Sequence, residues 1–293
     1  MMMTNTTMVR LGLVGAVALG GLVALAENLV SDTPSTGPDI RGTRAVQSNV
    51  ANQGEVAKAK SFLVLGDSIS DRHHIGCTKN YWGFLAERYG VTPFVYAING
   101  QQMRHIPDQA AAFLKEHPGE KPDVVFIFAG TNDYNGNAPL GEWYSFTNAV
   151  VNANGNEVTR RHRSFLFDKN TFRGRINLAI SFVREHFPEA WIVMLTPVHR
   201  GYANFGPKNV QPDESYANGR GLFLDAYVDA VKEAGNVWAV KVVDLHAVSG
   251  IFPNSPTQDA WISNPVRDRL HPSSLGHKRM ADAIAREIGG LFQ

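Results

Sequence analysis

Polar residues that could carry out acyl transfer stand at the ends of apolar runs in this sequence. The stretch SFLVLGDSISDRHH, residues 61–74, changes from apolar to polar at Gly66, and Ser68 follows two positions later. A serine in this place can be a nucleophile, provided that a base and a group that orients the base lie near it. It can equally be the polar N-cap of a helix that follows a strand. The local sequence alone leaves both interpretations open.

A candidate base and its partner lie near the C-terminal end of the chain. In RDRLHP, residues 267–272, Asp268 precedes His271 by three positions, just ahead of the last expected helix. On a turn, this spacing lets the carboxylate accept from one imidazole nitrogen while the other nitrogen faces a hydroxyl. Asp133 is a second candidate for the partner of His271. The fixed spacing favours Asp268.

Two further strand ends could supply hydrogen-bond donors for an oxyanion. After PFVYAI the chain continues with Asn99 and Gly100, and the missing side chain would let the glycine N–H approach a substrate closely. After DVVFIF comes AGTND, whose Asn132 carries a carboxamide donor. With the backbone N–H of Ser68, these groups give three candidate donors for an oxyanion hole.

The other reactive side chains point to no metal or cofactor. His73 and His74 are adjacent, so their side chains diverge, and no Cys or His spacing of a known zinc type surrounds them. Cys77 is the only cysteine and cannot form an intrachain disulfide; it is read as a small buried residue. No Gly-x-x-x-x-Gly-Lys phosphate loop occurs. We therefore expect neither a metal nor a cofactor.

The elements that would position these residues follow from an alternation of apolar and helical patterns. Continuous apolar runs, typical of buried parallel strands, cover residues 61–65, 93–98, 123–128, 191–195 and 237–245. Helical patterns cover residues 81–89, 106–115, 172–186, 221–233 and 275–292. The alternation predicts an α/β fold, a three-layer α/β/α sandwich around a five-stranded parallel sheet.

Three connections are far longer than the ~2–6 residues of ordinary ones. They follow the last three strands and cover residues 134–171, 200–220 and 246–264. Ligands bind at the carboxyl edge of such sheets, so these loops are expected to border a substrate cleft. Their aromatic residues either line that cleft or pin the loops to the body. These aromatic residues are Trp143, Tyr144, Phe146, Tyr202, Phe205, Tyr216 and Trp261.

The N-terminal segment is expected to lie outside this domain. Arg10 precedes an uncharged run that ends in Ala24-Leu25-Ala26, the small-x-small pattern of a signal-peptidase site. We predict a signal peptide over residues 1–26, a linker or N-terminal arm over 27–59 and the catalytic domain over 60–293. The run is shorter than the ~20 residues that a spanning helix needs. The protein is therefore expected to be exported, secreted or periplasmic, without stable membrane insertion.

The charge of the predicted mature chain is balanced. Without residues 1–26, 27 Lys and Arg remain against 27 Asp and Glu. Nucleic acids and anionic membranes are bound mainly through concentrated positive charge. The one dense basic cluster, TRRHR at residues 159–163, is interpreted as a solvated loop or a local ion-pair site. We therefore expect no nucleic-acid partner, and a small molecule or a polysaccharide ester as substrate.

The order of the motifs resembles that of the SGNH (GDSL) hydrolase family. GDSIS, Asn99-Gly100, GTND and DRLHP follow one another as in that family, and the resemblance covers Lys60 to the C-terminus. It implies a flavodoxin-like α/β/α fold. The nucleophile elbow of the α/β-hydrolase family fits this sequence worse, because Ser70 stands where the second glycine of its Gly-x-Ser-x-Gly motif would be. The resemblance assigns these roles: the nucleophile Ser68, the base His271, its partner Asp268, and the oxyanion-hole residues Ser68, Gly100 and Asn132.

The activity implied by this resemblance is ester hydrolysis through an acyl-enzyme, with no cofactor. Many such relatives are acetylesterases of polysaccharides, so the expected substrate is a short-chain acyl ester, chiefly acetyl, on carbohydrate. A lipid esterase, a lysophospholipase or a thioesterase is the main alternative. An acyltransferase or a non-catalytic carbohydrate-binding protein on the same fold also stays open, since access of water to an acyl-enzyme cannot be read from residue types.

Overall fold

The computed structural model describes residues 59–292. The predicted signal peptide and residues 27–58 of the predicted linker lie outside the described residues. Ala59, the first described residue, is buried, and its N–H donates to the carbonyl of Leu291 at 3.0 Å. A search of the described helices for one with the length and apolarity to cross a membrane found none.

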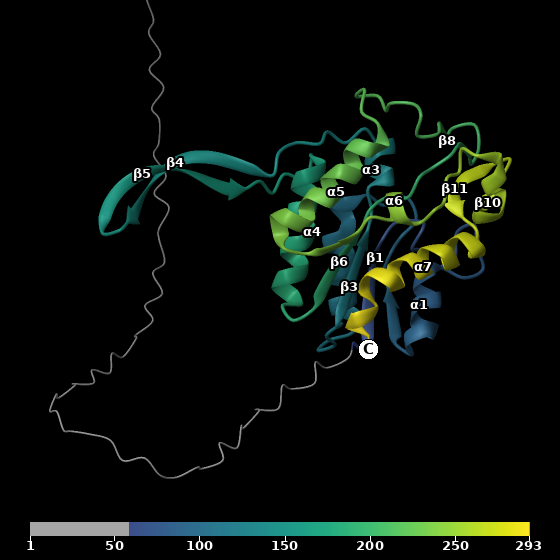
Figure 1. Cartoon of the computed structure of the whole chain (residues 1–293), viewed down its shortest axis with the longest axis horizontal. Coiled ribbons are helices and arrows are strands. Elements are labelled where there is room, and N and C mark those ends of the chain that lie inside the picture. Colours follow the sequence, from purple (N-terminus) through teal and green to yellow (C-terminus); the bar gives the residue numbers. More distant parts are fainter. Residues whose placement is uncertain (1–58, 293) are drawn as a thin grey trace, which may run out of the picture. The chain divides into compact units, whose positions relative to one another are not determined.

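Five parallel strands form the central sheet in the order β2-β1-β3-β6-β9 (Figure 1). Their bounds are β1 Ser61–Gly66, β2 Thr92–Val95, β3 Val124–Phe128, β6 Trp191–Leu195 and β9 Lys241–Val243. All residues of β3 are buried, as expected for a strand with neighbours on both sides and helices over both faces. The predicted five-stranded parallel sheet is confirmed.

Helices cover both faces of this sheet. They are α1 Tyr81–Tyr89, α2 Ile106–Glu116, α4 Phe172–His186, α5 Leu224–Trp238, α6 Leu245–Val248 and α7 Ser274–Ile288. Successive side chains of a strand point to opposite faces. Leu63 and Leu65 therefore pack into one core with α2, α4 and α5, whereas Phe62 and Val64 pack into a second core with α1 and α7. The chain thus has the predicted three-layer α/β/α fold.

The last strand was predicted too long. Residues 237–245 read as one apolar run, but α5 continues to Trp238 and β9 holds only three residues. The indole N–H of Trp238 donates to Asn177 on α4 at 2.8 Å, and its ring stacks on Phe165 at 4.2 Å. Ala239, with a φ of 50°, ends the helix. Packing of the last helical turn against α4 therefore overrides the β-rich composition.

The connection over residues 134–171 was expected to be a loop, and it contains a long hairpin instead. Strands β4 Tyr144–Ala153 and β5 Asn156–Phe165 pair antiparallel over their full length and extend from the body (Figure 1). Asn154 and Gly155 between them have φ of 54° and 82°, which suits a type I′ hairpin turn. The basic cluster at residues 159–163 therefore lies on an exposed strand rather than in a loop.

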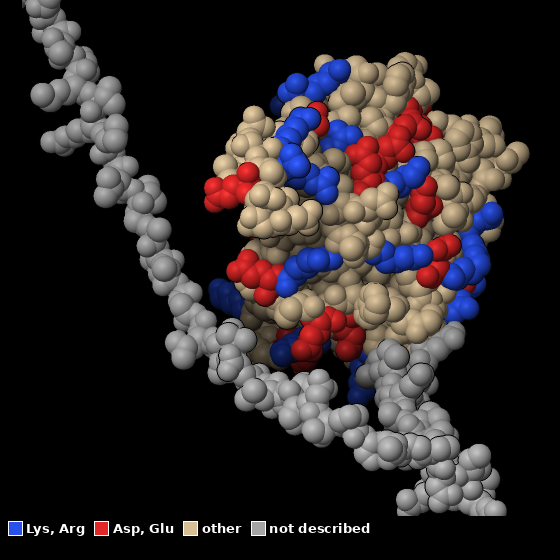
Figure 2. Space-filling model, turned by 60° about the vertical axis from the view of Figure 1, so that its left-hand side comes forward, with Lys and Arg blue, Asp and Glu red and all other residues tan. Residues whose placement is uncertain are grey.

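Charged groups of both signs are interspersed on the described face shown in Figure 2. Exposed ion pairs among the described residues include Lys278 with Asp282 at 2.9 Å and Lys241 with Glu287 at 2.9 Å. Such pairs usually contribute about 0–1 kcal/mol, because water and side-chain entropy offset the attraction. These exposed pairs therefore contribute little to the free energy of unfolding.

One such buried pair lies beside β3, and its loss is expected to destabilise the fold strongly. Asp133 accepts from Arg175 Nη1 at 2.7 Å, and the two side chains are only 0% and 7% exposed. Asp133→Ala leaves the guanidinium buried without its partner, so we expect the free energy of unfolding to fall by about 3–5 kcal/mol. Denaturant titration measures the loss, with the exposed Asp282→Ala as the control. Equal stability of the two variants would contradict this role of the pair.

Candidate active site

Ser68 lies in a turn directly after β1. A Cβ on Gly66, the last residue of that strand, would stand 2.4 Å from the carbonyl oxygen of Phe128, so only glycine allows this approach of β1 to β3. The carbonyl of Ser68 accepts from the N–H of Asp71 at 3.3 Å, and the next helix begins only at Tyr81. Ser68 therefore caps no helix, and that interpretation of the sequence was wrong.

Asp268 and His271 lie on β11 of a second, smaller sheet. This sheet has the strand order β10-β11-β7-β8. Its strands are β7 Ala203–Asn204, β8 Val210–Gln211, β10 Ile262–Asn264 and β11 Asp268–Pro272. Residues three apart on a regular strand face opposite sides. Here the register between β10 and β11 shifts, and Asp268 Oδ1 accepts the N–H groups of Leu270 at 3.2 Å and His271 at 3.0 Å. This local turn brings the two side chains together.

The serine, the histidine and the aspartate form a continuous hydrogen-bonded chain. Nδ1 of His271 donates to Asp268 Oδ2 at 2.9 Å, and the hydroxyl of Ser68 donates to His271 Nε2 at 2.9 Å. All three residues are at least nine-tenths buried. Asp133, the rival partner of the histidine, is bound by Arg175 instead. The arrangement is the one in which a histidine can remove a proton from a serine.

The carboxyl group of Asp268 is held in its ionised form. Its burial would by itself raise the pKa, but hydrogen bonds and charge from His271, with the backbone N–H groups of Leu270 and His271, outweigh this, so the pKa lies below its usual value. An ionised carboxylate orients the imidazole and stabilises the imidazolium that forms when the histidine takes up a proton.

A pocket of about 230 Å³ opens at this serine. It is lined by Ser68, Ile75, Asn99, Gly100, Asn132, Phe205, Asn209, Gln211, Leu270 and His271. Gly100 has a φ of 77°, and no atom would lie within 4 Å of a Cβ there. The left-handed backbone, rather than close packing, therefore favours glycine at this position. Both predicted side-chain and backbone donors, Asn132 and Gly100, border the same pocket as Ser68.

Asn132 comes from a short helix, α3 Thr131–Asn135, at the carboxyl end of β3. Its Nδ2 donates to the carbonyl of Gln101 at 3.0 Å. A carboxamide nitrogen carries two N–H groups, so this bond fixes the side chain and leaves the second N–H for a ligand. The structure thus places a held amide donor beside the serine.

Of the aromatic residues expected to border a cleft, Phe205 is the one that lines this pocket. Its ring centroid lies 5.5 Å from that of His271. Trp143 is buried and donates from its indole N–H to Glu233 at 2.7 Å, so it pins its loop to the body. Tyr144 and Phe146 lie on the hairpin. Of the two alternatives that the sequence left open, Phe205 therefore lines the pocket, whereas Trp143 pins its loop to the body.

Sequence analysis missed Asp71 as a positioning residue. Its carboxylate accepts the N–H of Asn99 at 2.6 Å and the N–H of His73 at 2.8 Å. It therefore ties the turn after Ser68 to the loop that presents Gly100. The only signal in the sequence was its place in GDSISD, which says nothing of a bond to a residue 28 positions away.

Arg200 was missed as well. It is 1% exposed, and its guanidinium donates to Thr131 Oγ1 at 3.2 Å and to Gln211 Oε1 at 2.8 Å. It thereby links the helix that carries Asn132 to one wall of the pocket. An arginine in a long polar loop is usually exposed, so no sequence signal indicated this burial.

The ambiguous residues near the serine have local partners other than Ser68. Nδ1 of His73 contacts Asp71 at 2.7 Å, and Nδ1 of His74 contacts Asn80 Oδ1 at 2.9 Å. Cys77 donates to the same Asn80 oxygen at 2.7 Å, and burial raises the pKa of its thiol to about 11. A thiol with so high a pKa is a poor nucleophile at neutral pH.

Asp67, next to the serine, is expected to make stability depend on pH. Burial raises its pKa to about 7, against the opposing effects of the Ile69 N–H and of His271 and Arg200. The folded state then keeps a proton that the unfolded state loses near pH 4, so this contribution is full below about pH 4 and is lost as pH rises through about 7. The difference corresponds to at most about 4 kcal/mol.

Asp67→Asn removes this titration and should flatten the dependence. We expect the free energy of unfolding, measured by denaturant titration between pH 4 and pH 8, to decline less in Asp67→Asn than in the wild type. The exposed Asp229→Asn should keep the wild-type slope. If Asp67→Asn kept the wild-type slope, the carboxyl group of Asp67 would not be the source of the pH dependence of stability.

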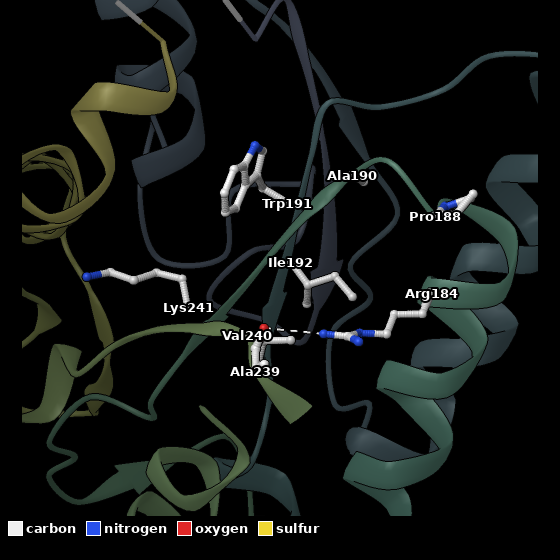
Figure 3. A pocket seen from close by; sticks show the side chains of 8 residues that line it. All are labelled: Arg184, Pro188, Ala190, Trp191, Ile192, Ala239, Val240 and Lys241. Atoms are coloured by element: carbon white, nitrogen blue, oxygen red, sulfur yellow. Dashed lines mark hydrogen bonds between the residues drawn. The ribbon is translucent and has the colours of Figure 1, made fainter. Parts of the chain in front are cut away.

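A larger hollow, of about 420 Å³, lies at the opposite edge of the sheet (Figure 3). Trp191 and Lys241, the first residues of β6 and β9, line it together with Arg184, which donates to the carbonyl of Ala239 at 3.3 Å. None of its lining residues carries a hydroxyl, thiol, carboxyl or imidazole group. Size alone therefore does not make it the place of a reaction.

A comparison with known proteins gives a match to one family model and to several solved structures. A family model described as the GDSL-like lipase/acylhydrolase family matches residues 64–279. A search of the curated proteins found no match. A protein from Lactobacillus plantarum is 23% identical with a TM-score of 0.60, over 80% of this chain and 98% of that one. A possible lipase from Chitinophaga pinensis is 21% identical with a TM-score of 0.57, over 79% and 98%.

A further structure that shares the fold is a salicylyl-acyltransferase from a tetracycline biosynthetic pathway. It is 15% identical with a TM-score of 0.52, and the match covers 81% of this chain and 56% of that one. At this level of identity the likeness concerns the fold alone.

Proposed function

Because the chain belongs to the GDSL-like lipase/acylhydrolase family, we propose that it is a serine esterase that cleaves short-chain acyl esters, chiefly acetyl esters, of carbohydrates. The observation that carries the proposal is the chain of hydrogen bonds from Ser68 through His271 to Asp268, each 2.9 Å long, at the wall of a pocket. Nucleophilic catalysis by serine needs this order of groups.

In the first half of the reaction the serine is acylated. The hydroxyl oxygen of Ser68 attacks the ester carbonyl while His271 Nε2 takes up its proton. The imidazolium then gives this proton to the leaving alcohol, and an acyl-enzyme remains. In the second half, His271 removes a proton from water, the hydroxide attacks the acyl carbon, and Ser68 leaves with the proton. The carboxylate of Asp268 stays ionised throughout and stabilises the imidazolium.

Three donors would stabilise the negative oxygen of the tetrahedral intermediates. They are the backbone N–H of Ser68, the backbone N–H of Gly100 and the free N–H of the Asn132 carboxamide. The carbonyl of Gln101 fixes the carboxamide, and the carboxylate of Asp71 fixes the loop before Gly100, so little reorganisation is needed when charge develops.

The size and lining of the pocket favour a short acyl group on a polar alcohol. Its volume of about 230 Å³ lies below the roughly 300–1,000 Å³ of sites that enclose drug-sized ligands. Its polar side chains, from Asn99, Asn132, Asn209 and Gln211, suit the hydroxyl groups of a sugar better than an alkyl chain. Phe205 offers a ring face beside them.

A series of p-nitrophenyl esters, from acetate to long acyl chains, tests the substrate class. We expect kcat/KM to be highest for acetate and to fall with chain length, and O-acetylated xylan fragments to release acetate. A preference for long chains would replace this proposal by a lipid esterase. Acyl transfer to an added sugar in excess of hydrolysis would replace it by an acyltransferase.

A further inference from the structure

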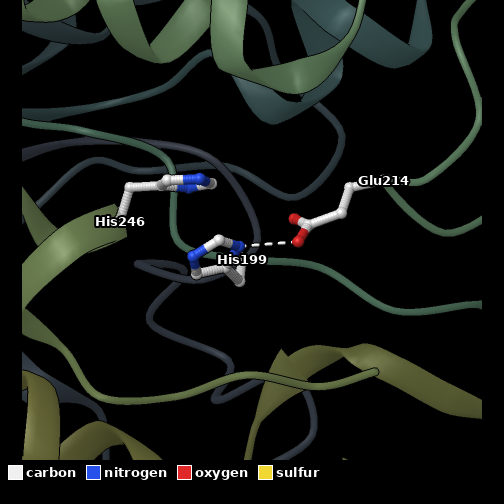
Figure 4. Close-up of side chains that lie close together, drawn as sticks. All are labelled: His199, Glu214 and His246. Atoms are coloured by element: carbon white, nitrogen blue, oxygen red, sulfur yellow. Dashed lines mark hydrogen bonds and ion pairs between the residues drawn. The ribbon is translucent and has the colours of Figure 1, made fainter. Parts of the chain in front are cut away.

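A second group of chemically reactive side chains lies away from the catalytic pocket. His199 follows β6, Glu214 lies in the long loop over residues 200–220, and His246 belongs to α6. None of the three lines the pocket at Ser68. Figure 4 shows the side chains turned toward one another from three separate segments. One potential ligand atom from each lies within 4.8 Å of the other two.

The contacts within this group are close. Nδ1 of His199 lies 2.6 Å from Glu214 Oε1, and the ring centroids of His199 and His246 are 3.6 Å apart. The three side chains are 25%, 14% and 15% exposed in the order His199, Glu214 and His246. Two imidazoles in contact repel each other when both are imidazolium cations. At least one is therefore neutral and has a ring nitrogen with a free lone pair.

His246 is the imidazole with that lone pair. Burial lowers its pKa, and the neighbouring His199 lowers it further, so the neutral ring is favoured. Its Nδ1 is buried and has no hydrogen-bond partner among the described residues. Its Nε2 lies 4.0 Å from the carboxylate of Asp225.

Residues outside the cluster contact each of its three members. Oε2 of Glu214 accepts the backbone N–H of Arg200 at 2.9 Å, which leaves Oε1 for another partner. The rings of Phe252 and His199 pack in a T-shaped arrangement with centroids 5.1 Å apart. The backbone N–H of His246 donates to Thr196 Oγ1 at 3.0 Å. The carboxylate of Glu214 is thus held by a hydrogen bond from outside the cluster, and the backbone that carries His246 is fixed to Thr196.

We propose that His199, Glu214 and His246 bind a zinc ion, with a fourth position open to water. Two imidazoles and one carboxylate are an established ligand set for zinc, and they leave one position for water. Zinc–nitrogen distances of about 2.0–2.1 Å place tetrahedral ligand atoms about 3.3 Å apart, so His199 and Glu214 would separate slightly to admit the ion. His199 would bind the ion through Nδ1, the ring nitrogen that faces Glu214.

The bound ion would tie the loop over residues 200–220 to the body of the protein. The segment between Arg200 and Glu214 contributes Phe205, Asn209 and Gln211 to the catalytic pocket. Zinc would fix Glu214 at one end of this segment to the ends of β6 and β9. Its role is therefore to stabilise the loop, and the proposal does not depend on the proposed esterase activity.

Calorimetric titration of the full chain, without an affinity tag and after removal of metals by chelation, with zinc chloride tests this site. We expect one equivalent to bind, to raise the melting temperature, and to bind at least tenfold more weakly in His246→Gln and in Glu214→Gln. His186→Ala, at an exposed histidine of α4, and His271→Ala should bind zinc as the wild type does. Co²⁺ in place of zinc should give the visible absorption of a four-coordinate ion, and both ligand variants should lose it.

Other outcomes would overturn the assignment. Absence of binding, or equal affinity in the wild type and in both ligand variants, would remove zinc from this site. Loss of binding in His271→Ala alone would move the ion to the catalytic histidine. Circular dichroism and melting curves of the metal-free variants establish that they are folded, and the two independent ligand variants guard against a defect of either one.

Discussion

Replacement of Ser68 by alanine is expected to lower kcat for p-nitrophenyl acetate by roughly 10⁴- to 10⁶-fold. The variant loses the hydroxyl that donates to His271 Nε2, so no acyl-enzyme can form. The side chain is small and lies in a turn, so the melting temperature should change little. Steady-state kinetics with long incubation measures the residual rate.

Ser70→Ala is the matched control. This serine is two positions away and also buried, but its hydroxyl forms a hydrogen bond with Tyr81 instead of the histidine. It should keep most of the activity even if its stability falls. Wild-type activity in a folded Ser68→Ala variant would rule out this serine as the nucleophile, and loss of activity in both variants with loss of folding would call for His271→Ala as the deciding variant.

Asn132→Ala is expected to lower kcat by about 10²- to 10³-fold with little change in KM. The carboxamide would donate to an oxygen that bears negative charge only in the transition state, so its removal should affect that state more than the bound ester. The triad contacts do not involve Asn132, because they join Ser68, His271 and Asp268. Steady-state kinetics over a range of acetate ester concentrations separates kcat from KM.

Asn209→Ala provides the comparison, since this asparagine lines the same pocket from the loop over residues 200–220. It would contact the alcohol part of the substrate, so we expect its loss to raise KM more than it lowers kcat. If kcat fell equally in both variants, or more in Asn209→Ala, Asn132 would not be the asparagine that contacts the oxyanion.

Most of the fold could be predicted from the sequence, because the apolar and helical patterns of its strands and helices agree with the way in which these elements pack. Apolar runs at β1, β3 and β6 and helical spacing at α1 and α4 gave the layers and nearly all boundaries of these elements. Disagreement arose where packing decided. Trp238 joins a helix because its ring meets Phe165, and the polar strands β4 and β5 lack the apolar alternation by which strands are recognised.

The hairpin still had one signal, the Asn154-Gly155 pair, which favours a two-residue turn. The candidate site was predictable to a similar extent. Ser68, Asp268 and His271 meet because short motifs stand at sheet edges that the topology brings together. The carboxylate of Asp71, the buried guanidinium of Arg200 and the cluster around His246 depend on contacts between distant segments, and single residue types carry no sign of such contacts.

We expect Ser68 to react as a nucleophile that His271 activates. Reaction of the wild type with an alkyl fluorophosphonate, which phosphonylates activated serines, followed by mass spectrometry of the peptides, tests it most directly. One adduct should form, located on Ser68, and His271→Ala should prevent it. A protein that stays unlabelled, or that is labelled at another serine, would contradict it.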